Sequence, residues 1–337
     1  MSIIEKESQF LNAKQKLIEL KAEIQKFIVG QDEVIDTVLW SIFAGGHALL
    51  EGLPGLGKTM LIRTISECMD LTFSRIQFTP DLMPSDITGT NVLERDENGN
   101  PFFRFHQGPL FHHIVLADEI NRATPKTQSA LLEAMGEKTV TVLGETKPML
   151  SPFFVLATQN PIDMEGTYPL PEAQMDRFLC KIIVNYPTKP ELKQIVLRTT
   201  SVDQIKISKV MTAEEVIQLQ GLAKEVLISD ELLDYAIQII SMTHPDDEHA
   251  PEIVKKYVQY GSGPRGLQSL IRIAKVRSLF SGRYAVSTGD IKKAALPVLR
   301  HRLFINFEGE AEGIKPEQII QEVLQHADQL GGVLHGK

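Results

Sequence analysis

The stretch Gly52-Leu53-Pro54-Gly55-Leu56-Gly57-Lys58-Thr59 decides the fold of this chain. It fits the pattern G-x-x-x-x-G-K-[ST], in which backbone N–H groups and a lysine enclose the phosphates of a nucleotide. A short apolar run at 47–51 precedes the loop, and Leu61, Ile62 and Ile65 follow it at helical spacing. The order of strand, glycine loop and helix is the one that this kind of phosphate-binding site requires.

The same segment supplies most of the expected contacts to a nucleotide. Glycines let the backbone close around the phosphates, Lys58 adds a positive charge, and the hydroxyl of Thr59 is a ligand for Mg²⁺. The predicted ATP-binding residues of the segment are Gly52, Pro54, Gly55, Leu56, Gly57, Lys58, Thr59 and Met60. ATP and Mg²⁺ are therefore the predicted cofactors.

The composition limits the class of protein. The length of 337 residues suits a large domain with a smaller companion, and 43% hydrophobic and 23% charged residues are ordinary for a globular protein. A net charge of -8 disfavours a protein whose main task is to grip nucleic-acid phosphates. No apolar run approaches the roughly 20 residues that cross a bilayer, and no leader pattern opens the chain. We therefore expect a cytoplasmic protein without a membrane segment.

Cysteine and histidine residues give little sign of a structural metal or a disulfide. Cys68 and Cys180 are the only cysteines, and both lie in apolar patterns, so we expect core thiols in a reducing compartment. His106, His112 and His113 have no cysteine or carboxylate partners at metal-ligand spacing. We expect them to be core or loop residues.

Apolar runs bounded by turn residues predict a parallel sheet. They alternate with helical patterns, which is typical of strands covered by helices on both faces. The runs lie at 47–51, 73–78, 113–117, 153–158 and 181–184. Two further segments, 91–105 around Asn98-Gly99 and 139–149 around Gly144, break the alternation and are predicted to be inserted β-hairpins.

From Thr188 onward the strand signal fades and helix starts recur. Three capping boxes are predicted where a Ser or Thr precedes an acidic residue by three positions. They are Thr188 with Glu191, Thr212 with Glu215, and Ser287 with Asp290. We place the boundary near Tyr186-Pro187, so the predicted fold class is α/β, with a nucleotide-binding domain at 1–187 and a smaller all-helical domain at 188–337.

An acidic pair completes the expected phosphate chemistry. The apolar run at 113–117 is followed directly by Asp118-Glu119. Asp118 is expected near Mg²⁺ together with Thr59, and Glu119 is expected to orient or deprotonate the attacking water. Alone, such a pair is usually the start of a solvated loop. The glycine loop about 60 residues upstream favours the catalytic interpretation.

Three more polar residues are candidates whose roles the residues alone leave open. Asn160 follows the run at 153–158, at the edge of the sheet where ligands bind. It either hydrogen-bonds the γ-phosphate or its water, or belongs to a turn with Pro161. Arg177 and Arg265 either neutralise charge in the transition state or are ordinary surface arginines.

Together these motifs resemble the MoxR branch of the AAA+ ATPases. The resemblance covers nearly the whole chain, and its middle motifs are specific to the branch. It rests on the glycine loop and on the segments 77–86, 117–123, 166–178 and 263–265. It implies an AAA+ core with one hairpin inserted in its second helix, a second hairpin before the strand that leads to Asn160, and a helical lid.

The resemblance also implies roles for single residues of the nucleotide pocket. Ile28, Val29 and Gly30 would line the adenine pocket, and Asn160 would be the sensor 1 residue. Together with Lys58 of the glycine loop and Glu119 of the acidic pair, these residues would form one ATP site.

For the arginines, the resemblance implies a ring. Arg265 would be the sensor 2 residue of the lid, and Arg177 the arginine finger offered to the neighbouring subunit. The role of Arg122 stays open between a contact to the neighbour's nucleotide and a brace within its own loop. Relatives imply a hexameric, chaperone-like motor that matures a protein client, often with a von Willebrand factor A domain partner. This chain contains no such domain, so the client would be met in trans.

Two other classes of function compete with this interpretation. A nucleic-acid motor would use its hairpins to grip DNA, but the segment 139–149 has Lys147 without a dense basic cluster, and 91–105 has Arg95 and Arg104 among acidic residues. A small-molecule kinase would share the glycine loop and the magnesium residues, but it would not need a finger arginine. Nucleic acid is therefore an unlikely partner by these patterns.

Overall fold

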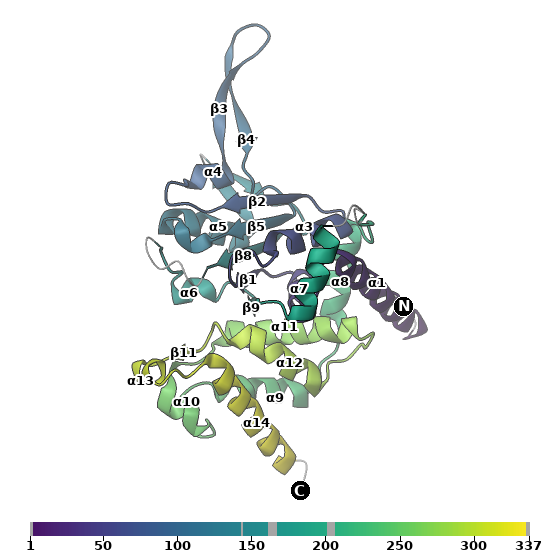
Figure 1. Ribbon diagram of the computed structural model, residues 1–337, viewed down its shortest axis with the longest axis vertical. Coiled ribbons are helices and arrows are strands. Elements are labelled where there is room, and N and C mark those ends of the chain that lie inside the picture. The colour runs from purple at the N-terminus through teal and green to yellow at the C-terminus, as the bar shows by residue number, and fades with distance from the viewer. Residues whose placement is uncertain (1–2, 143, 161–166, 201–205, 335–337) are drawn as a thin grey trace.

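The computed structural model describes residues 3–142, 144–160, 167–200 and 206–334. An α/β domain that carries a long projecting hairpin lies above a helical domain, which we call the lid (Figure 1). Helix α1 (Ile3–Phe27) opens the chain at the side of the α/β domain.

A parallel sheet forms the centre of the α/β domain. Within the described residues it has five strands in the order β2, β5, β8, β1, β9. These strands are β2 (Phe73–Gln77), β5 (Ile114–Asp118), β8 (Phe154–Gln159), β1 (Ala48–Glu51) and β9 (Cys180–Ile183). Each agrees with a predicted apolar run to within one residue at either end.

The strands are apolar on both faces because both faces are covered. Side chains alternate along a strand, so Leu49 and Val115 enter one core and Leu50 and Leu116 enter the other. All four are fully buried. The Leu50 side is covered by α1, α2 (Asp32–Phe43) and α3 (Lys58–Cys68), and the Leu49 side by α5 (Pro125–Glu137).

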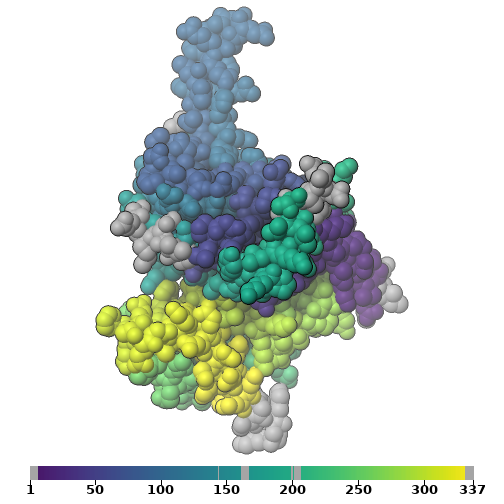
Figure 2. Space-filling model, viewed as in Figure 1, coloured from purple at the N-terminus to yellow at the C-terminus, as the bar shows by residue number. Residues whose placement is uncertain are grey.

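Two antiparallel hairpins are inserted in the α/β domain, as predicted. The first joins β3 (Gly89–Arg95) to β4 (Pro101–Gln107) and stands clear of the domain surface (Figure 2). The second joins β6 (Thr139–Val142) to β7 (Glu145–Pro148). Short elements in the connecting segments are α4 (Pro84–Thr88), the 3-10 turn η1 (Ile120–Arg122) and α6 (Glu172–Met175).

Helices dominate the rest of the chain. α7 (Lys189–Thr199) packs against α1, where Arg198 donates hydrogen bonds to the carbonyl groups of Gln25 and Lys26. The lid helices are α8 (Ala213–Glu225), α9 (Asp230–Ser241), α10 (Glu252–Tyr257), α11 (Pro264–Phe280), α12 (Thr288–Leu299), α13 (Phe307–Ala311) and α14 (Pro316–Leu334). All three predicted capping boxes are present.

The second domain differs from the prediction in one respect. It was expected to be all-helical, but it also contains a two-stranded antiparallel pair, β10 (Val258–Tyr260) with β11 (Phe304–Ile305). Strands of three and two residues are too short to produce a readable periodicity. β9 ends at Ile183 and α7 begins at Lys189, and the domain boundary at Tyr186-Pro187 stays a prediction.

The described helices include none that combines the length and the apolar character needed to cross a bilayer. Both cysteines are buried in the core, as predicted. Burial raises the pKa of the Cys68 thiol to about 12 and that of the Cys180 thiol to about 11.

Candidate nucleotide site

Strand β1 leads the chain into the glycine loop, and α3 begins at Lys58. Gly55 and Gly57 have φ values of 83° and 76°, a backbone conformation that residues with a Cβ rarely adopt. A Cβ on Gly52 would lie 2.9 Å from the Cβ of Val184. Glycine is therefore needed at position 52 for space and at positions 55 and 57 for conformation.

Lys58 lies in the first turn of α3, and its side chain returns to the loop. Its Nζ donates a hydrogen bond to the carbonyl oxygen of Gly52 at 2.8 Å. Partial burial lowers the pKa of Lys58, while the negative charges of Asp118 and Glu119 act in the opposite direction. The loop lysine and the acidic pair therefore interact across one edge of the sheet.

Asp118 ends β5, and both of its carboxylate oxygens are engaged. Oδ1 accepts a hydrogen bond from Oγ1 of Thr158 at 2.6 Å, and Oδ2 accepts one from Arg75 at 2.7 Å. The side chain is only 14% exposed. These contacts hold the carboxylate in one orientation at the carboxyl edge of the sheet.

Glu119 has a left-handed backbone, with φ 57° and ψ 50°. Its N–H donates to Oγ1 of Thr158 at 2.9 Å. Its Oε2 accepts hydrogen bonds from Gln77 at 2.8 Å and from Arg122 at 3.0 Å. Arg122 thus braces the acidic residue within its own chain. Unfavourable backbone conformations that the surroundings maintain are concentrated at functional sites.

Sequence reasoning missed Arg75, Gln77 and Thr158, which hold the acidic pair. Arg75 and Gln77 are two residues apart on β2 and so share a face. Gln77 is in register with Asp118 on the neighbouring strand. The sequence signal for these residues was the pair of polar residues on either side of Ile76 in a run predicted to be a strand. It indicates that Arg75 and Gln77 share a face of the strand, but it does not show which strand lies beside them. The partner follows only from the strand order.

Asn160 directly follows β8, the strand that lies between β5 and β1. Its neighbour Gln159 is paired with Glu51, the last residue of β1 before the glycine loop. The structure therefore brings Asn160 to the same edge as the loop and the acidic pair. Pro161 of the expected turn and Gly166 of the family motif lie outside the described residues.

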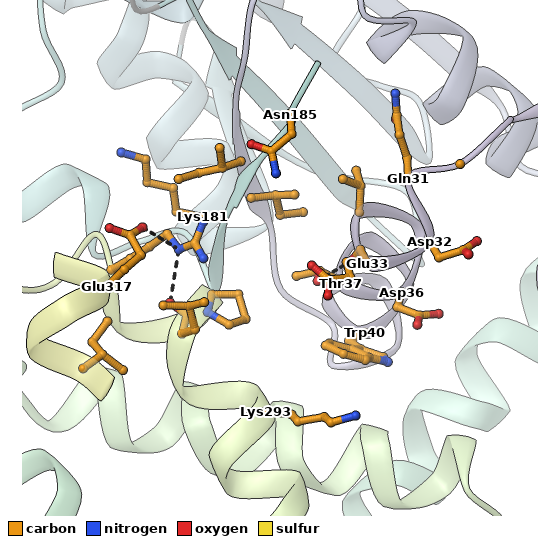
Figure 3. Close-up of a pocket in the computed structure, with 18 of the residues that line it drawn as sticks. Gln31, Asp32, Glu33, Asp36, Thr37, Trp40, Lys181, Asn185, Lys293 and Glu317 are labelled. Carbon is orange, nitrogen blue, oxygen red and sulfur yellow. Dashed lines mark hydrogen bonds and ion pairs between the residues drawn. The ribbon is translucent and has the colours of Figure 1, made fainter. Parts of the chain in front are cut away.

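A cavity of about 780 Å³ lies between the α/β domain and the lid (Figure 3). Val29 and Gly30 line it, whereas Ile28 packs against the hydrophobic core behind. Gln31, which also lines the cavity, donates from Nε2 to the carbonyl oxygen of Leu56 at 3.1 Å. None of the described loop residues 52–59 lines the cavity, so the cavity adjoins the glycine loop through Gln31.

Arg177 and Arg265 do not join this cluster. The guanidinium of Arg177 donates to a backbone carbonyl of α5 at 2.9 Å, and Arg265, in the first turn of α11, lies 3.6 Å from a carboxylate oxygen of Asp176. Asp176 precedes β9, and the first residue of β9, Cys180, pairs with Ala48, the first residue of β1. The glycine loop follows the last residue of β1. Both arginines are therefore at the amino edge of the sheet, away from the phosphate loop of their own chain.

The groups gathered at the carboxyl edge fit a nucleotide with Mg²⁺. Around Gly55 and Gly57 the loop is open, because beyond the neighbouring residues no described heavy atom lies within 4 Å of a Cβ built there. Helix α3 begins directly after the loop, and the N–H groups of a helix N-terminus favour an anion. The oxygen atoms of Asp118 and Thr59 are the ligands that Mg²⁺ prefers.

Comparisons with known proteins decide the family. Residues 47–180 match the family described as "ATPase family associated with various cellular activities (AAA)", and residues 250–323 match the "AAA lid domain". The chain is 42% identical to Chaperone MoxR1 of Mycobacterium tuberculosis, over 90% of this chain and 79% of that protein. The chain belongs to the MoxR family of AAA+ ATPases. The resemblance inferred from the motifs is thereby confirmed.

Two more comparisons agree with membership of the MoxR family. Protein MoxR of Methylorubrum extorquens is 29% identical, and the match covers 88% of this chain and 90% of that protein. The crystal structure of a candidate ATPase from Cytophaga hutchinsonii has a TM-score of 0.91 at 42% identity, over 97% of this chain and 98% of that chain. The predicted α/β AAA+ fold with a helical lid is confirmed.

Proposed function

We propose that this MoxR-family chain hydrolyses ATP in a magnesium-dependent reaction. The observation that supports the proposal most directly is the meeting of three charged groups at one edge of the sheet. Lys58 returns into the glycine loop, and Asp118 and Glu119 lie close enough to change its pKa. A lysine for phosphate beside a carboxylate pair is the group set that phosphoryl transfer to water requires.

Each residue has a separate task in the proposed reaction. Lys58 and the loop N–H groups hold the phosphates, and Asn160 orients the γ-phosphate or the attacking water. Mg²⁺, when bound, neutralises charge on the phosphate oxygens, and Thr59 and Asp118 are the residues that would hold it. Glu119 accepts the proton of the attacking water.

The adenine base is assigned to the cavity between the domains. Val29 and Gly30 line this cavity, with Ile28 packed against the core, and they directly precede Gln31, which contacts the glycine loop. An adenine base held there would contact both the α/β domain and the lid. Nucleotide binding would therefore favour one distance between these two domains.

The proposal extends to a ring of identical subunits, with six as the expected number. Arg177 is exposed, and the side chain of Arg265 is 62% exposed. Both lie at the edge of the sheet that is away from their own phosphate loop. A neighbouring subunit can present its nucleotide to this edge, with Arg177 as the arginine finger and Arg265 as the sensor 2 residue.

The work done by the ring is proposed to be chaperone-like remodelling of a protein client in the cytoplasm, with a von Willebrand factor A domain protein as partner. MoxR1 of Mycobacterium tuberculosis is named a chaperone. The projecting hairpin presents Leu93 and Phe103, which are 60% and 71% exposed. Its basic side chains Arg104 and His106 both contact Glu94. Arg95 is followed directly by Asp96 and Glu97, so the hairpin offers DNA little net positive charge.

The first test is nucleotide binding and turnover. Lys58→Ala should abolish tight MgATP binding by calorimetry, because it deletes the one side-chain charge inside the loop. Lys209→Ala, which removes an exposed ion pair with Asp70, is the matched control and should bind as the parent does. Unchanged affinity in Lys58→Ala would contradict the proposed site.

The same assay separates the competing functions. ATP turnover is measured alone, with single-stranded DNA and with duplex DNA at fixed salt. The proposal expects no stimulation by either nucleic acid. A strong stimulation would instead identify a nucleic-acid motor, and transfer of phosphate to a small molecule of cell extract would identify a kinase.

A further inference from the structure

Arg302 of the lid reaches into the α/β domain and is almost completely buried, with 3% of its surface exposed. Its Nε donates to Oδ1 of Asp176 at 2.7 Å, Nη2 donates to the carbonyl oxygen of Phe178 at 2.8 Å, and Nη1 to that of Leu179 at 3.2 Å. All three nitrogens therefore bind one short segment, 176–179, which joins α6 to β9.

The segment held in this way contains Arg177. Asp176 before it and Phe178 after it are both bound by the same guanidinium. Phe178 is fully buried, and the N–H of Leu179 donates to the carbonyl oxygen of His47 at 2.8 Å. Arg177 is thus an exposed residue between two anchored positions, and its backbone cannot shift unless Arg302 shifts with it.

Asp176 binds a second lid arginine. Its other carboxylate oxygen lies 3.6 Å from Arg265, the exposed arginine of α11. Arg302 is in turn fixed within the lid, because it donates to Oγ of Ser269 on α11 at 3.2 Å and to the carbonyl oxygen of Val298. The carboxylate of Asp176 therefore links Arg265 to the buried guanidinium, and Asp176 is also the chain neighbour of Arg177.

We propose that Asp176 and Arg302 form a clamp that positions Arg177 and Arg265 together toward the nucleotide of the neighbouring subunit. This inference rests on the proposed function, since it takes Arg177 to be the arginine finger. A guanidinium with acceptors on all three nitrogens has a single geometry, and breaking a buried ion pair leaves an uncompensated charge. The lid and the segment 176–179 therefore move as one unit. Asp176 and Arg302 are positioning residues, because they act on the phosphates only through the two exposed arginines.

Two substitutions at Asp176 test its contacts to Arg265 and to Arg302. Asp176→Asn removes the charge that pairs with both Arg265 and Arg302, but it keeps an oxygen that can accept the hydrogen bond from Arg302, and it should lower kcat about tenfold. Asp176→Ala removes both contacts and should lower kcat about 100-fold. In both variants the KM for ATP and the affinity for MgATP should stay within about twofold, because their own phosphate loop is intact. Glu67→Gln, which removes a carboxylate paired with Arg63 on the exposed face of α3, is the matched control and should keep the parent kcat.

The decisive measurement repeats Asp176→Ala in protein that already carries Arg177→Ala and Arg265→Ala. If the clamp acts by positioning these two arginines, single-turnover rates should change by less than about twofold in that background. Asp176→Asn serves in the same cycle if Asp176→Ala does not fold. An equal loss of rate in both backgrounds would overturn the clamp, because the effect would then be independent of the arginines.

The design also separates failure of the clamp from failure of the proposed ring chemistry. If Arg177→Ala alone keeps the parent kcat, Arg177 is not an arginine finger, and the proposed ring chemistry and the clamp both fail. If Arg177→Ala is inactive while Asp176→Ala keeps the parent kcat, only the clamp is wrong.

Discussion

Glu119, the proposed catalytic base, departs from the regular backbone pattern of the strand that precedes it. β5 sends alternate side chains to two buried cores, and the left-handed backbone at Glu119 ends that alternation. Such a conformation costs about 1 kcal/mol or more for a residue with a Cβ. The hydrogen bonds from Gln77 and Arg122 to the carboxylate, and from its N–H to Thr158, offset that cost.

Glu119→Gln should separate binding from turnover. The amide keeps the size of the side chain and an oxygen for Gln77, but it cannot accept a proton from water. MgATP should bind with affinity within about threefold of the parent, while kcat falls by about 100-fold or more. Calorimetry and phosphate release measure the two quantities. A kcat near that of the parent would assign the base to another residue.

At this scale, the sequence was informative where the chemistry is local. The glycine loop and Asp118-Glu119 were predicted because each is a short run with its own physical signature. Arg75 and Thr158 were not, because they reach Asp118 only across the neighbouring strands β2 and β8. Arg302 was missed for the same reason, since it lies 126 residues from its partner Asp176 in the sequence.

Among the elements, the first hairpin joins the α/β domain at Gly89 and Gly108, where its two ends pass close together. We call these two glycines the neck of the hairpin. A Cβ on Gly89 would lie 2.3 Å from the carbonyl oxygen of His106, and one on Gly108 would lie 2.3 Å from that of Ile87. Just beyond the neck, the rings of Phe105 and Phe111 pack edge to face with centroids 5.6 Å apart. The base of the hairpin is therefore packed, while its outer part is exposed.

Gly89→Ala and Gly99→Ala form a matched pair that tests this neck. Both glycines have a positive φ, 93° and 82°, but only Gly89 has backbone atoms in the way of a Cβ. Gly99→Ala should lower the free energy of unfolding by about 1 kcal/mol through backbone strain alone. Gly89→Ala should lower it by about 3 kcal/mol, since overpacking adds to the strain. Equal losses in urea denaturation would show that the neck tolerates a methyl group.

The elements themselves were largely predictable, and the reason is burial on both faces. All five sheet strands were found as apolar runs, and both hairpins were found from breaks in that pattern around Asn98-Gly99 and Gly144. The pair β10 and β11 was not predicted, because strands of three and two residues are too short for an alternation of side chains to be recognised. Strand order was not readable from any run, so neither was the edge at which Arg177 and Arg265 lie.

Over the whole molecule, hydrogen bonds hold the lid to the α/β domain at several points. Gln220 of α8 donates to the carbonyl oxygen of Ile42 at 2.7 Å, and Arg272 of α11 donates to that of Ala44. Arg302 adds the buried contact to the segment before β9. If the proposed nucleotide changes the distance between the two domains, we expect these contacts to transmit the change, and Arg302 to transmit it to the segment that contains Arg177.

The proposal that two subunits share each active site is tested by mixing two inactive variants. Arg177→Ala should bind nucleotide nearly as the parent does and lose turnover by roughly 10³-fold or more, as arginine fingers do in general. Lys58→Ala should lose binding. A mixed ring contains interfaces that pair an intact loop with an intact finger, so activity should return on mixing. If light scattering shows mixed assemblies and the mixture stays inactive, Arg177 acts within its own subunit.

The two deeply buried thiols have a practical consequence for spectroscopy. Cys68 and Cys180 are fully buried, and burial holds the pKa of each far above neutral pH, so neither presents a thiolate to an electrophilic dye on the folded protein. A cysteine introduced at the exposed Asn98, in the turn of the projecting hairpin, would then be the single site of maleimide coupling without removal of a native thiol. Fluorescence from that position would show whether the hairpin tip moves when MgATP is added.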